Sequence, residues 1–344
     1  MIKAKIGDNL IGNEEPCYII AEIGSNHNGD IGIAKKLIDI SYEAGADAVK
    51  FQIFNEQNLY SKYTPDFSYL KDKNVYNLIK EIKTPREWIK ELYNYCLQKN
   101  IEFLATPFDY EAVDLLDNYV NAYKLASFEI VDLELIKYIA KKNKPIIIST
   151  GMANLGEIED AINSAKSVGN GNIILMQCNS VYPTPPEIVN LKTIQTMEKA
   201  FLLPVGFSDH TTGIHIPIAA VVIGAKLIEK HITLDRKMKG PDHSFAIEPA
   251  ELKEMVSNIR DVEKSIGNGI KDKSNLESDE MYLKARRSIH AKMDIQIGEE
   301  ITKDMLIVKR PGYGIKPKFI DILVGSKAKR DIKEDSWISW DMIQ

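Results

Sequence analysis

Eight short apolar runs alternate with amphipathic stretches along the first three quarters of the chain. The runs span residues 17–22, 48–52, 102–106, 122–127, 145–150, 173–178, 204–209 and 226–231. Their apolar character is nearly continuous rather than alternating, which is typical of strands buried on both faces of a parallel sheet. We therefore expect eight parallel strands.

The stretches between the runs repeat apolar residues at helical spacing and predict α-helices. These stretches are residues 33–38, 86–99, 132–142, 155–167, 214–223 and 249–265. Asp132 and Pro249 stand where helix-start residues are favoured. Eight such alternations over about 250 residues match a TIM (β/α)8 barrel. A doubly wound open sheet is the alternative, but no G-x-G-x-x-G motif follows the first run.

The chain changes character after the last helical stretch. Residues 269–284 are polar and charged and contain glycine, so we expect a linker there. This places a barrel over residues 1–268 and a small separate domain over residues 285–344. A domain of about 60 residues has only a marginal core of its own. We therefore expect this domain to pack against the barrel or against a second subunit.

Charge and composition argue against a nucleic-acid-binding protein, a membrane protein and a disulfide-rich secreted protein. The 344 residues carry a formal net charge of −5, whereas nucleic-acid-binding surfaces carry excess Lys and Arg. No apolar run approaches the roughly 18 residues that a membrane span needs, and the first residues do not resemble a signal peptide. The cysteines are three in number and widely spaced, which fits reduced thiols better than a disulfide framework. We expect a soluble cytoplasmic protein.

Polar residues follow every predicted strand, at the end where a TIM barrel carries its chemistry. They are Glu22, Lys50, Gln52, Thr106, Lys124, Ser127, Glu129, Ser149, Thr150, Asn179, Ser180, Ser208, His210, Lys230 and His231. Charged groups inside a barrel are costly unless they are paired or bind a ligand. We therefore expect a functional pocket, with a structural salt-bridge network as the alternative.

Two histidines at neighbouring strand ends indicate a metal-binding site. His210 and His231 end the seventh and eighth predicted strands, which are neighbours in a closed barrel, so both imidazoles can reach one ion. With the carboxylates of Glu22 and Asp242 they suit a divalent transition metal such as Mn²⁺ or Zn²⁺. The alternative is that His210 caps a turn and His231 packs in the core. His243 is close enough to Asp242 in sequence to face the same pocket.

Lysines and serines at the strand ends offer cations and hydroxyls to an anion with phosphate and carboxylate groups. These residues are Lys50, Lys124, Ser127, Ser149, Ser180 and Ser208. Each serine alone could instead serve a turn or a cap. A desolvated lysine could also form a Schiff base with a carbonyl substrate, for which Lys124 and Lys50 are both candidates. Glu129 could act as a general acid/base or pair with Lys124.

The motifs of the chain resemble those of the sialic acid synthases. The matching stretches are I-A-E-I-G-S-N-H-N-G (20–29), A-V-K-F-Q (48–52), T-P-F (106–108), S-T-G-M (149–152), Y-P-T-P (182–185), G-F-S-D-H (206–210), I-E-K-H (228–231) and G-P-D-H (240–243). They follow the family's order across nearly the whole chain. The sequence K-R-P-G at 309–312 resembles the antifreeze-like (SAF) domain that ends these enzymes.

The resemblance implies a TIM barrel followed by a SAF domain, in a domain-swapped homodimer. It implies condensation of phosphoenolpyruvate with an N-acetylated amino-sugar aldose and water, giving a nine-carbon nonulosonic acid and phosphate. It also implies Mn²⁺ on His210 and His231, with Mg²⁺ or Co²⁺ as substitutes. Stretches 83–88, 123–130 and 310–314 favour a pseudaminic acid synthase, with neuraminate and legionaminic acid synthases as alternatives, whereas residues 242–246 resemble the synthase-like proteins linked to spore-coat polysaccharide.

The resemblance further implies roles for individual residues. The catalytic residues would be Glu22, Lys124, Glu129 and Asp242. Phosphoenolpyruvate would be bound by Lys50, Lys124, Ser127, Ser149, Asn179, Ser180 and Ser208. The sugar would be bound by Gln52, Tyr182, Asp242 and Arg310, the last reaching in from the partner protomer. A Schiff-base aldolase on the same barrel and a non-catalytic carbohydrate-binding protein are the alternatives from other classes.

Overall fold

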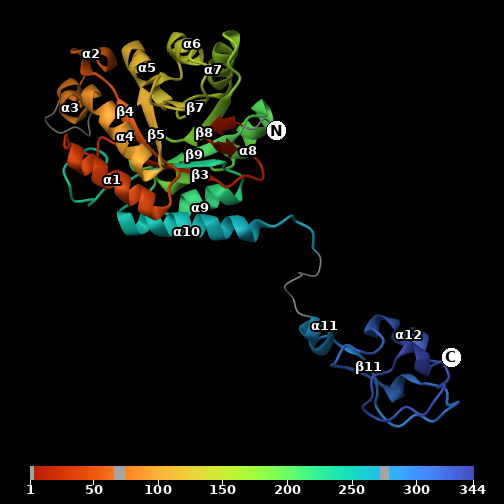
Figure 1. Cartoon of the computed structure of the whole chain (residues 1–344). Helices are drawn as coiled ribbons and strands as arrows, with labels where there is room; N and C mark the ends of the chain where they lie inside the picture. The colour runs from red at the N-terminus through yellow and green to blue at the C-terminus, as the bar shows by residue number, and fades with distance from the viewer. Residues whose placement is uncertain (1–3, 66–73, 272–278) are drawn as a thin grey trace. The chain divides into compact units, whose positions relative to one another are not determined.

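The structure of the chain is a computed structural model, drawn in Figure 1. It describes residues 4–65, 74–271 and 279–344. The chain divides into two compact units, Met1–Gly267 and Asn268–Gln344. The expected linker, residues 269–284, lies partly outside the described residues. Its last residues belong to a short helix, α11 (Asp279–Ala285), rather than to an irregular segment.

Eight parallel strands close into a barrel in the first unit. They are β3 (Tyr18–Gly24), β4 (Ala48–Ile53), β5 (Glu102–Pro107), β6 (Tyr123–Leu125), β7 (Ile146–Ser149), β8 (Ile173–Cys178), β9 (Val205–Asp209) and β10 (Leu227–His231). Each strand pairs with the next along the chain, and β10 also pairs with β3 to complete the circle. The prediction of a TIM barrel is confirmed, with each predicted run forming one of these strands.

Helices on the outside of the barrel follow the predicted stretches. They are α1 (Ile31–Ala44), α4 (Ile89–Lys99), α6 (Leu133–Ala140), α7 (Leu155–Ser167), α9 (His215–Val222) and α10 (Pro249–Ile266). Asp132 caps α6 by accepting from the Leu135 N–H, and Pro249 opens α10, as predicted. The helix α10 lies beside α1 and α9 (Figure 1).

Four helices of nine residues or fewer are not predicted from the sequence patterns. They are α2 (Glu56–Leu59), α3 (Val75–Ile82), α5 (Tyr110–Leu116) and α8 (Thr193–Phe201). Each has between about one turn and about two and a half turns, so the helical repeat of apolar residues is too short to stand out from the surrounding loops.

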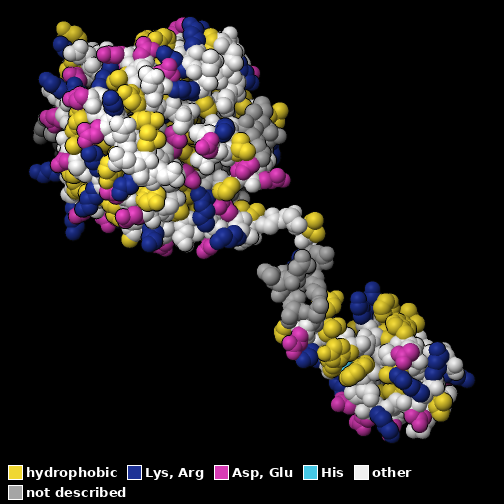
Figure 2. Space-filling view, in the orientation of Figure 1, with side chains coloured by type: hydrophobic (Ala, Val, Ile, Leu, Met, Phe, Trp, Pro, Cys, Tyr) yellow, Lys and Arg dark blue, Asp and Glu magenta, His cyan; other side chains and the backbone are white. Residues whose placement is uncertain are grey.

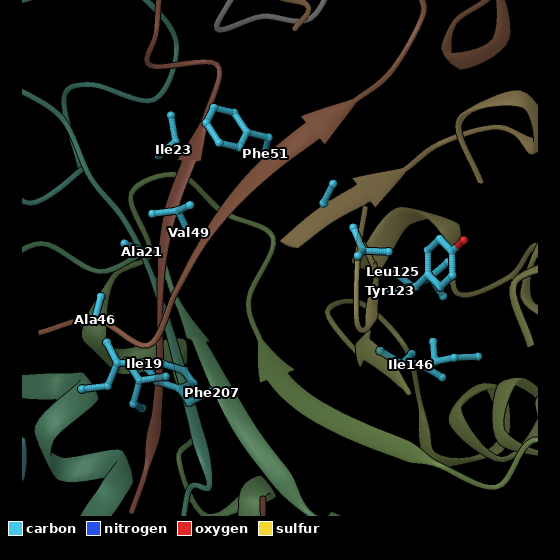
Figure 3. Close-up of a cluster of buried hydrophobic side chains, with 14 of the residues drawn as sticks. Ile19, Ala21, Ile23, Ala46, Val49, Phe51, Tyr123, Leu125, Ile146 and Phe207 are labelled. Atoms are coloured by element: carbon cyan, nitrogen blue, oxygen red, sulfur yellow. The ribbon is translucent and has the colours of Figure 1, made fainter. Parts of the chain in front are cut away.

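Side chains along each barrel strand alternate between the inside of the barrel and the layer beneath the helices. Figure 3 shows part of the outer layer, including Ile19 and Ala21 from β3 and Val49 and Phe51 from β4. A separate inner cluster is formed by Tyr18, Ile20, Ala48, Leu104, Ala122, Ile147, Ile174, Met176 and Leu227. Because both faces of each strand are buried, the strands appear in the sequence as continuous apolar runs.

A hairpin that no sequence pattern predicts closes the amino end of the barrel. Its strands, β1 (Ala4–Ile6) and β2 (Asn9–Ile11), pair in antiparallel fashion. Ala4, Ile6 and Ile11 are buried and belong to the inner cluster. The amino end of the barrel interior is therefore filled with apolar side chains, and polar groups inside the barrel lie toward the carboxyl ends.

The second unit has an apolar core of its own. It contains α11, the antiparallel strands β11 (Ser288–Ala291) and β12 (Leu306–Lys309), and α12 (Ile320–Leu323). Its buried side chains are Ile289, Ala291, Ile295, Ile301, Leu306, Ile315, Leu323, Ala328, Ile332, Ile338 and Ile343.

On the face of the first unit in view in Figure 2, Lys and Arg are interspersed with Asp and Glu. Of the described helices, none has the length and apolarity that crossing a membrane demands.

Candidate active site at the carboxyl ends of the barrel strands

The inward positions of the barrel strands change from apolar to polar toward the carboxyl ends. The inward polar residues there are Glu22, Lys50, Gln52, Thr106, Lys124, Ser149, Cys178, Ser208, His210, Glu229 and His231. All of them except Gln52 are buried. This collar of polar side chains brings together residues from eight strands, so the polar strand ends of the sequence do meet at one place.

Lys50 is held as a cation within this collar. Its Nζ lies 2.7 Å from Glu22 Oε2 and 3.7 Å from Glu229 Oε2, and it donates to Thr106 Oγ1 at 3.2 Å. Burial disfavours the charged ammonium, but the two carboxylates outweigh it and raise the pKa of Lys50. Gln52 Nε2 donates to the other oxygen of Glu22 at 2.7 Å.

Glu229, which the sequence analysis does not single out, lies between the two buried lysines. Its Oε1 is 3.8 Å from Lys124 Nζ and accepts from Ser208 Oγ at 2.9 Å. Lys124 Nζ also donates to Ser149 Oγ at 2.6 Å. Together with the Lys50 contact, these distances make Glu229 the carboxylate on which the two cations converge.

Lys230 points away from this network, although it stands among the polar strand ends of the sequence. Its Nζ pairs with Asp209 Oδ2 at 2.6 Å and also donates to the Thr211 carbonyl. Glu229 and His231 flank it in β10 and share the inside of the barrel, because side chains alternate along a strand. That alternation is the signal by which the sequence could have identified Glu229 and excluded Lys230.

Burial and pairing set the charge states of the buried acids and bases. Burial lowers the pKa of Lys124, and Glu229 opposes this only in part. For Glu229 itself, burial favours the neutral acid, but Lys124 and Lys50 outweigh it and lower its pKa. Burial raises the pKa of Glu22, with Lys50 acting against it. The network therefore places the two lysine side chains next to two carboxyl groups, those of Glu22 and Glu229, in the buried interior of the barrel.

Hydroxyl groups crowd around Gly151, in the loop after β7. Ser127 Oγ accepts from the Gly151 N–H at 3.1 Å and donates to Cys178 Sγ at 3.5 Å. A Cβ at Gly151 would lie 2.6 Å from Ser180 Oγ and 2.8 Å from Ser127 Oγ. The absence of a side chain at this residue is thus required for the two hydroxyls to come together. Hydroxyl and N–H donors beside a lysine are the groups that cradle a phosphate.

The two histidines lie side by side, with ring centroids 5.4 Å apart. His210 Nδ1 faces the Asn179 carbonyl oxygen at 2.9 Å, so Nε2 is the nitrogen left for a ligand. His231 Nδ1 is buried 3.7 Å from Asp242 Oδ2 and has no hydrogen-bond partner among the described residues. Phe245 packs edge-on against both rings. The two imidazoles are therefore neighbours, so one ion could lie within reach of both.

This donor set fits a divalent transition metal, which imidazole and carboxylate ligands suit. Burial, with His210 adding to it, lowers the pKa of His231 well below its usual range, so this ring is neutral, the form that binds metal. Burial also raises the pKa of Asp242 to about 6. Across residues 4–65, 74–271 and 279–344, no group of three or more His, Cys, Asp or Glu is placed to hold an ion by itself. An ion on the two imidazoles would have positions left for substrate or water.

Three residues predicted to act in catalysis or on the sugar surround Gly24. A Cβ at Gly24 would lie 3.2 Å from Glu22 Oε1, 3.3 Å from Gln52 Nε2 and 3.6 Å from Asp242 Oδ2. Gly24 has φ of 51°, which favours glycine, and it leaves open space between these three polar groups. The arrangement places one amide and two carboxyl groups around one point, and such groups can hydrogen-bond to hydroxyl groups.

Glu129 lies on the loop after β6, and its Oε2 is buried without a hydrogen-bond partner among the described residues. Burial raises the pKa of Glu129 to about 7, with the charge of Lys124 acting against it. A carboxyl group that titrates near neutral pH can both give and take a proton. This environment fits the acid/base alternative of the sequence analysis.

The loop after β8 contains further predicted residues. Asn179 Nδ2 donates to the Ile188 carbonyl at 2.9 Å, so the Asn179 side chain links the two ends of this loop. Its Oδ1 is buried and hydrogen-bonds to no described residue. Tyr182 is 44% exposed, and its ring centroid lies 4.3 Å from that of His210. Tyr182 therefore offers an aromatic face beside the paired histidines.

One predicted placement is wrong, and another concerns a residue of the second unit. His243 is fully buried between Thr233 and Asn28, at 2.7 and 3.0 Å, so it holds loops together and does not face the pocket. Arg310 belongs to the second unit, where it is exposed at the end of β12. Its role at the site stays a prediction.

Comparison with known proteins identifies the family to which this fold and site belong. Residues 37–271 match the model of the NeuB family, and residues 286–344 match the model of the SAF domain. The chain belongs to the NeuB family. The predicted membership among the sialic acid synthases and the prediction of an enzyme are confirmed.

The relatives of this NeuB chain include several synthases. It is 45% identical to the N,N'-diacetyllegionaminic acid synthase of Campylobacter jejuni, over 93% of this chain and 98% of that one. It is 36% identical to the pseudaminic acid synthase of the same species, over 94% and 96% of the two chains. It also resembles a crystal structure of N-acetylneuraminic acid (sialic acid) synthetase from Leptospira borgpetersenii, with TM-score 0.73, 34% identity, and coverage of 81% and 96%.

Replacing Glu229 tests whether its carboxylate stabilises the fold as the shared partner of Lys50 and Lys124. We expect Glu229→Gln to lower the free energy of unfolding by about 3 kcal/mol, because two buried cations lose their shared partner. Urea unfolding followed by circular dichroism measures this. Asp261→Asn is the control, since Asp261 pairs with Lys264 on the exposed surface of α10 and its replacement should cost about 1 kcal/mol or less. Equal losses in the two variants would contradict the central placement of Glu229.

The raised pKa of Glu129 predicts a pH dependence of stability. The folded pKa of about 7 exceeds the ordinary value of 4.5, so the folded state keeps a proton that the unfolded state has lost between these pH values. The Glu129 contribution is therefore fully present below pH 4.5, declines as pH rises to 7, and totals at most about 3 kcal/mol. Urea titrations at pH 5, 6, 7 and 8 should show a steeper fall for the wild type than for Glu129→Gln. Parallel curves would contradict the buried carboxyl.

Proposed function

We propose that the protein condenses phosphoenolpyruvate with an N-acetylated amino-sugar aldose and water, releasing phosphate and a nonulosonic acid. The observation that carries this proposal is the pair of buried lysines, Lys50 and Lys124, converging on Glu229 beside two adjacent histidines. A pocket of this kind is equipped for a small dianion or trianion and a metal ion. The relatives named above, which are synthases of legionaminic, pseudaminic and sialic acids, support the same reaction.

In this proposal the phosphoenolpyruvate anion occupies the space bounded by the two lysines and Gly151. Lys124 Nζ lies 2.6 Å from Ser149 Oγ, and the Gly151 N–H lies 3.1 Å from Ser127 Oγ, so strand ends and loops both supply donors to the ligand in this proposal. An arriving phosphate and carboxylate would take over part of the charge compensation that Glu229 and Glu22 now supply to the cations. Ser180 and Ser208 add hydroxyls at the edges of this set.

We propose that Mn²⁺ is the resident ion on His210 and His231, and that Mg²⁺ or Co²⁺ can substitute. When bound, such an ion supplies Lewis acidity to the aldose carbonyl. His231 is neutral, and His210 directs Nδ1 to a backbone carbonyl, so Nε2 is the His210 nitrogen that faces a ligand. The carboxyl group of Asp242 at 3.7 Å from His231 can hold a water molecule or a sugar hydroxyl next to the ion.

The groups of the chain match the steps of the condensation. C3 of phosphoenolpyruvate forms a bond to the aldose carbonyl carbon, whose oxygen takes up the electron pair of the C=O bond and a proton to become a hydroxyl group, and positive charge develops at C2. Water then adds to C2 and loses a proton, for which Glu129, with its pKa of about 7, is the acceptor. The C2–O bond to phosphate breaks, and Lys124 with the serines stabilises the departing charge. Glu22, Gln52 and Asp242 would orient the sugar hydroxyls.

We propose a 2,4-diacetamido-trideoxyhexose as the aldose, in preference to N-acetylmannosamine. The motifs at 123–130 and 310–314 favour the pseudaminic precursor, whereas the higher identity to a legionaminic acid synthase, 45% against 36%, favours the legionaminic isomer. Both isomers share the diacetamido pattern, so this substrate class is common to the two arguments.

We further propose a domain-swapped homodimer in which Arg310 of one protomer reaches the sugar in its partner's pocket. The exposed guanidinium of Arg310 in a unit that matches the SAF domain supports this. We also propose that the enzyme works in the cytoplasm, because its three cysteines are buried free thiols.

A Schiff-base aldolase acting through Lys124 is the second candidate, because burial lowers the pKa of Lys124 and favours the neutral amine. Borohydride reduction in the presence of the aldose separates the two functions. Covalent trapping of the sugar on Lys124 would favour the aldolase, and its failure favours the condensation.

Metal removal tests the proposed reaction. Protein stripped with a chelator should release no phosphate from phosphoenolpyruvate with N-acetylmannosamine, the legionaminic precursor or the pseudaminic precursor, and Mn²⁺ should restore release with at least one of them. His231→Ala should stay inactive with Mn²⁺ while keeping its circular dichroism spectrum. His215→Ala, at an exposed histidine at the start of α9, should be restored like the wild type. Full activity after rigorous chelation rejects the metal.

Removing the guanidinium of Arg310 tests the swapped dimer. We expect Arg310→Ala to raise the apparent KM for the aldose by about 10- to 100-fold, because a charged hydrogen bond is lost, with little change in the KM for phosphoenolpyruvate. Arg330→Ala is the control, since Arg330 pairs with Asp341 on the surface of the same unit. An unchanged KM in Arg310→Ala contradicts this role.

A further inference from the structure

The loop after β8, residues 179–188, contacts His210 through three different groups. The Asn179 carbonyl oxygen lies 2.9 Å from His210 Nδ1. The Tyr182 ring lies against the imidazole with centroids 4.3 Å apart. The Thr184 N–H donates to the His210 carbonyl at 2.9 Å. One loop thus holds both the ring and the backbone of this histidine.

Thr184 is the residue that keeps this loop folded on itself. It is 4% exposed, and its hydroxyl donates to the Val181 carbonyl at 2.6 Å, with the Asn179 carbonyl at 3.4 Å. Asn179 Nδ2 closes the other side of the loop by donating to the Ile188 carbonyl. The carbonyl that faces His210 is therefore fixed from two directions by side chains of its own loop.

These contacts select one tautomer of His210. A carbonyl oxygen can only accept a hydrogen bond, so the proton of the neutral ring must be on Nδ1. Cys178 Sγ, at 3.9 Å from the same nitrogen, can also accept from it. The lone pair is then on Nε2, at the opposite side of the ring, where a metal ion can bind. The partners of a metal-binding histidine commonly fix its tautomer in this way.

We propose that Thr184 is a positioning residue for His210, so that the loop 179–188 joins the sugar-facing Tyr182 and the metal-binding imidazole into one rigid element. This deepens the proposed function and rests on it as far as the metal is concerned. Asn179 then supports His210 through its backbone carbonyl, which faces the imidazole, and through its side-chain hydrogen bond to the Ile188 carbonyl. This supporting role is separate from any direct contact with phosphoenolpyruvate.

The test compares Thr184→Val, which keeps the shape and removes the hydroxyl, with Thr184→Ser, which restores the hydroxyl. Mn²⁺ titration of chelated protein followed by electron paramagnetic resonance gives the affinity. We expect Thr184→Val to weaken Mn²⁺ binding about tenfold or more and Thr184→Ser to bind like the wild type. Equal affinity of all three proteins, or equal weakening in both variants, overturns the proposal.

A second measurement needs no metal. Long-range ¹H–¹⁵N correlation spectra of the metal-free protein report the tautomer of His210. We expect the Nδ1-protonated form in the wild type and in Thr184→Ser, and a mixture in Thr184→Val and in Asn179→Asp, which loses the donor to Ile188. An unchanged tautomer in both altered proteins overturns the proposal. Wild-type protein that shows the expected tautomer but binds no Mn²⁺ would instead reject the metal in the proposed function and leave the positioning of His210 standing.

Discussion

The interior of a closed barrel admits charged side chains only if each has a partner there, and the site of this protein depends on that constraint. Lys50 pairs with Glu22 at 2.7 Å, and Glu229 lies 3.7 and 3.8 Å from Lys50 and Lys124. Each charge is costly alone and is tolerated because the opposite charge is fixed nearby on the next strand or across the barrel. In the proposed reaction, an anionic ligand would replace carboxylates as the partner of the lysines.

The barrel scaffold sets where this network can lie. The hairpin of β1 and β2 fills the amino end with Ile6 and Ile11, and the inner cluster above it is apolar. Polar inward side chains therefore begin at the last residue of each strand or within three residues of it. Loops then supply what the strands cannot: Ser127 and Gly151 as donors, Glu129 as a buried acid, and the loop 179–188 as the support of His210.

The sequence predicted the eight strands because each is buried on both faces and so forms a continuous apolar run. It located most of the polar collar because strand ends are easy to find in such a pattern. It missed Glu229, although the alternation of inward and outward side chains in I-E-K-H distinguishes it from Lys230. It missed the hairpin because two strands of three residues show no periodicity. Backbone contacts such as that of Asn179 with His210 depend on loop geometry, which no residue pattern encodes.

The most direct measurement is calorimetric titration of phosphoenolpyruvate into the metal-free protein and into Lys124→Met. The two-lysine pocket predicts one ligand per chain for the wild type, with binding at least tenfold weaker in Lys124→Met, because a charge-assisted contact to the anion is lost. Equal affinity in the two proteins, or the absence of binding to a folded wild type, would contradict an anion pocket built on Lys50, Lys124 and Glu229.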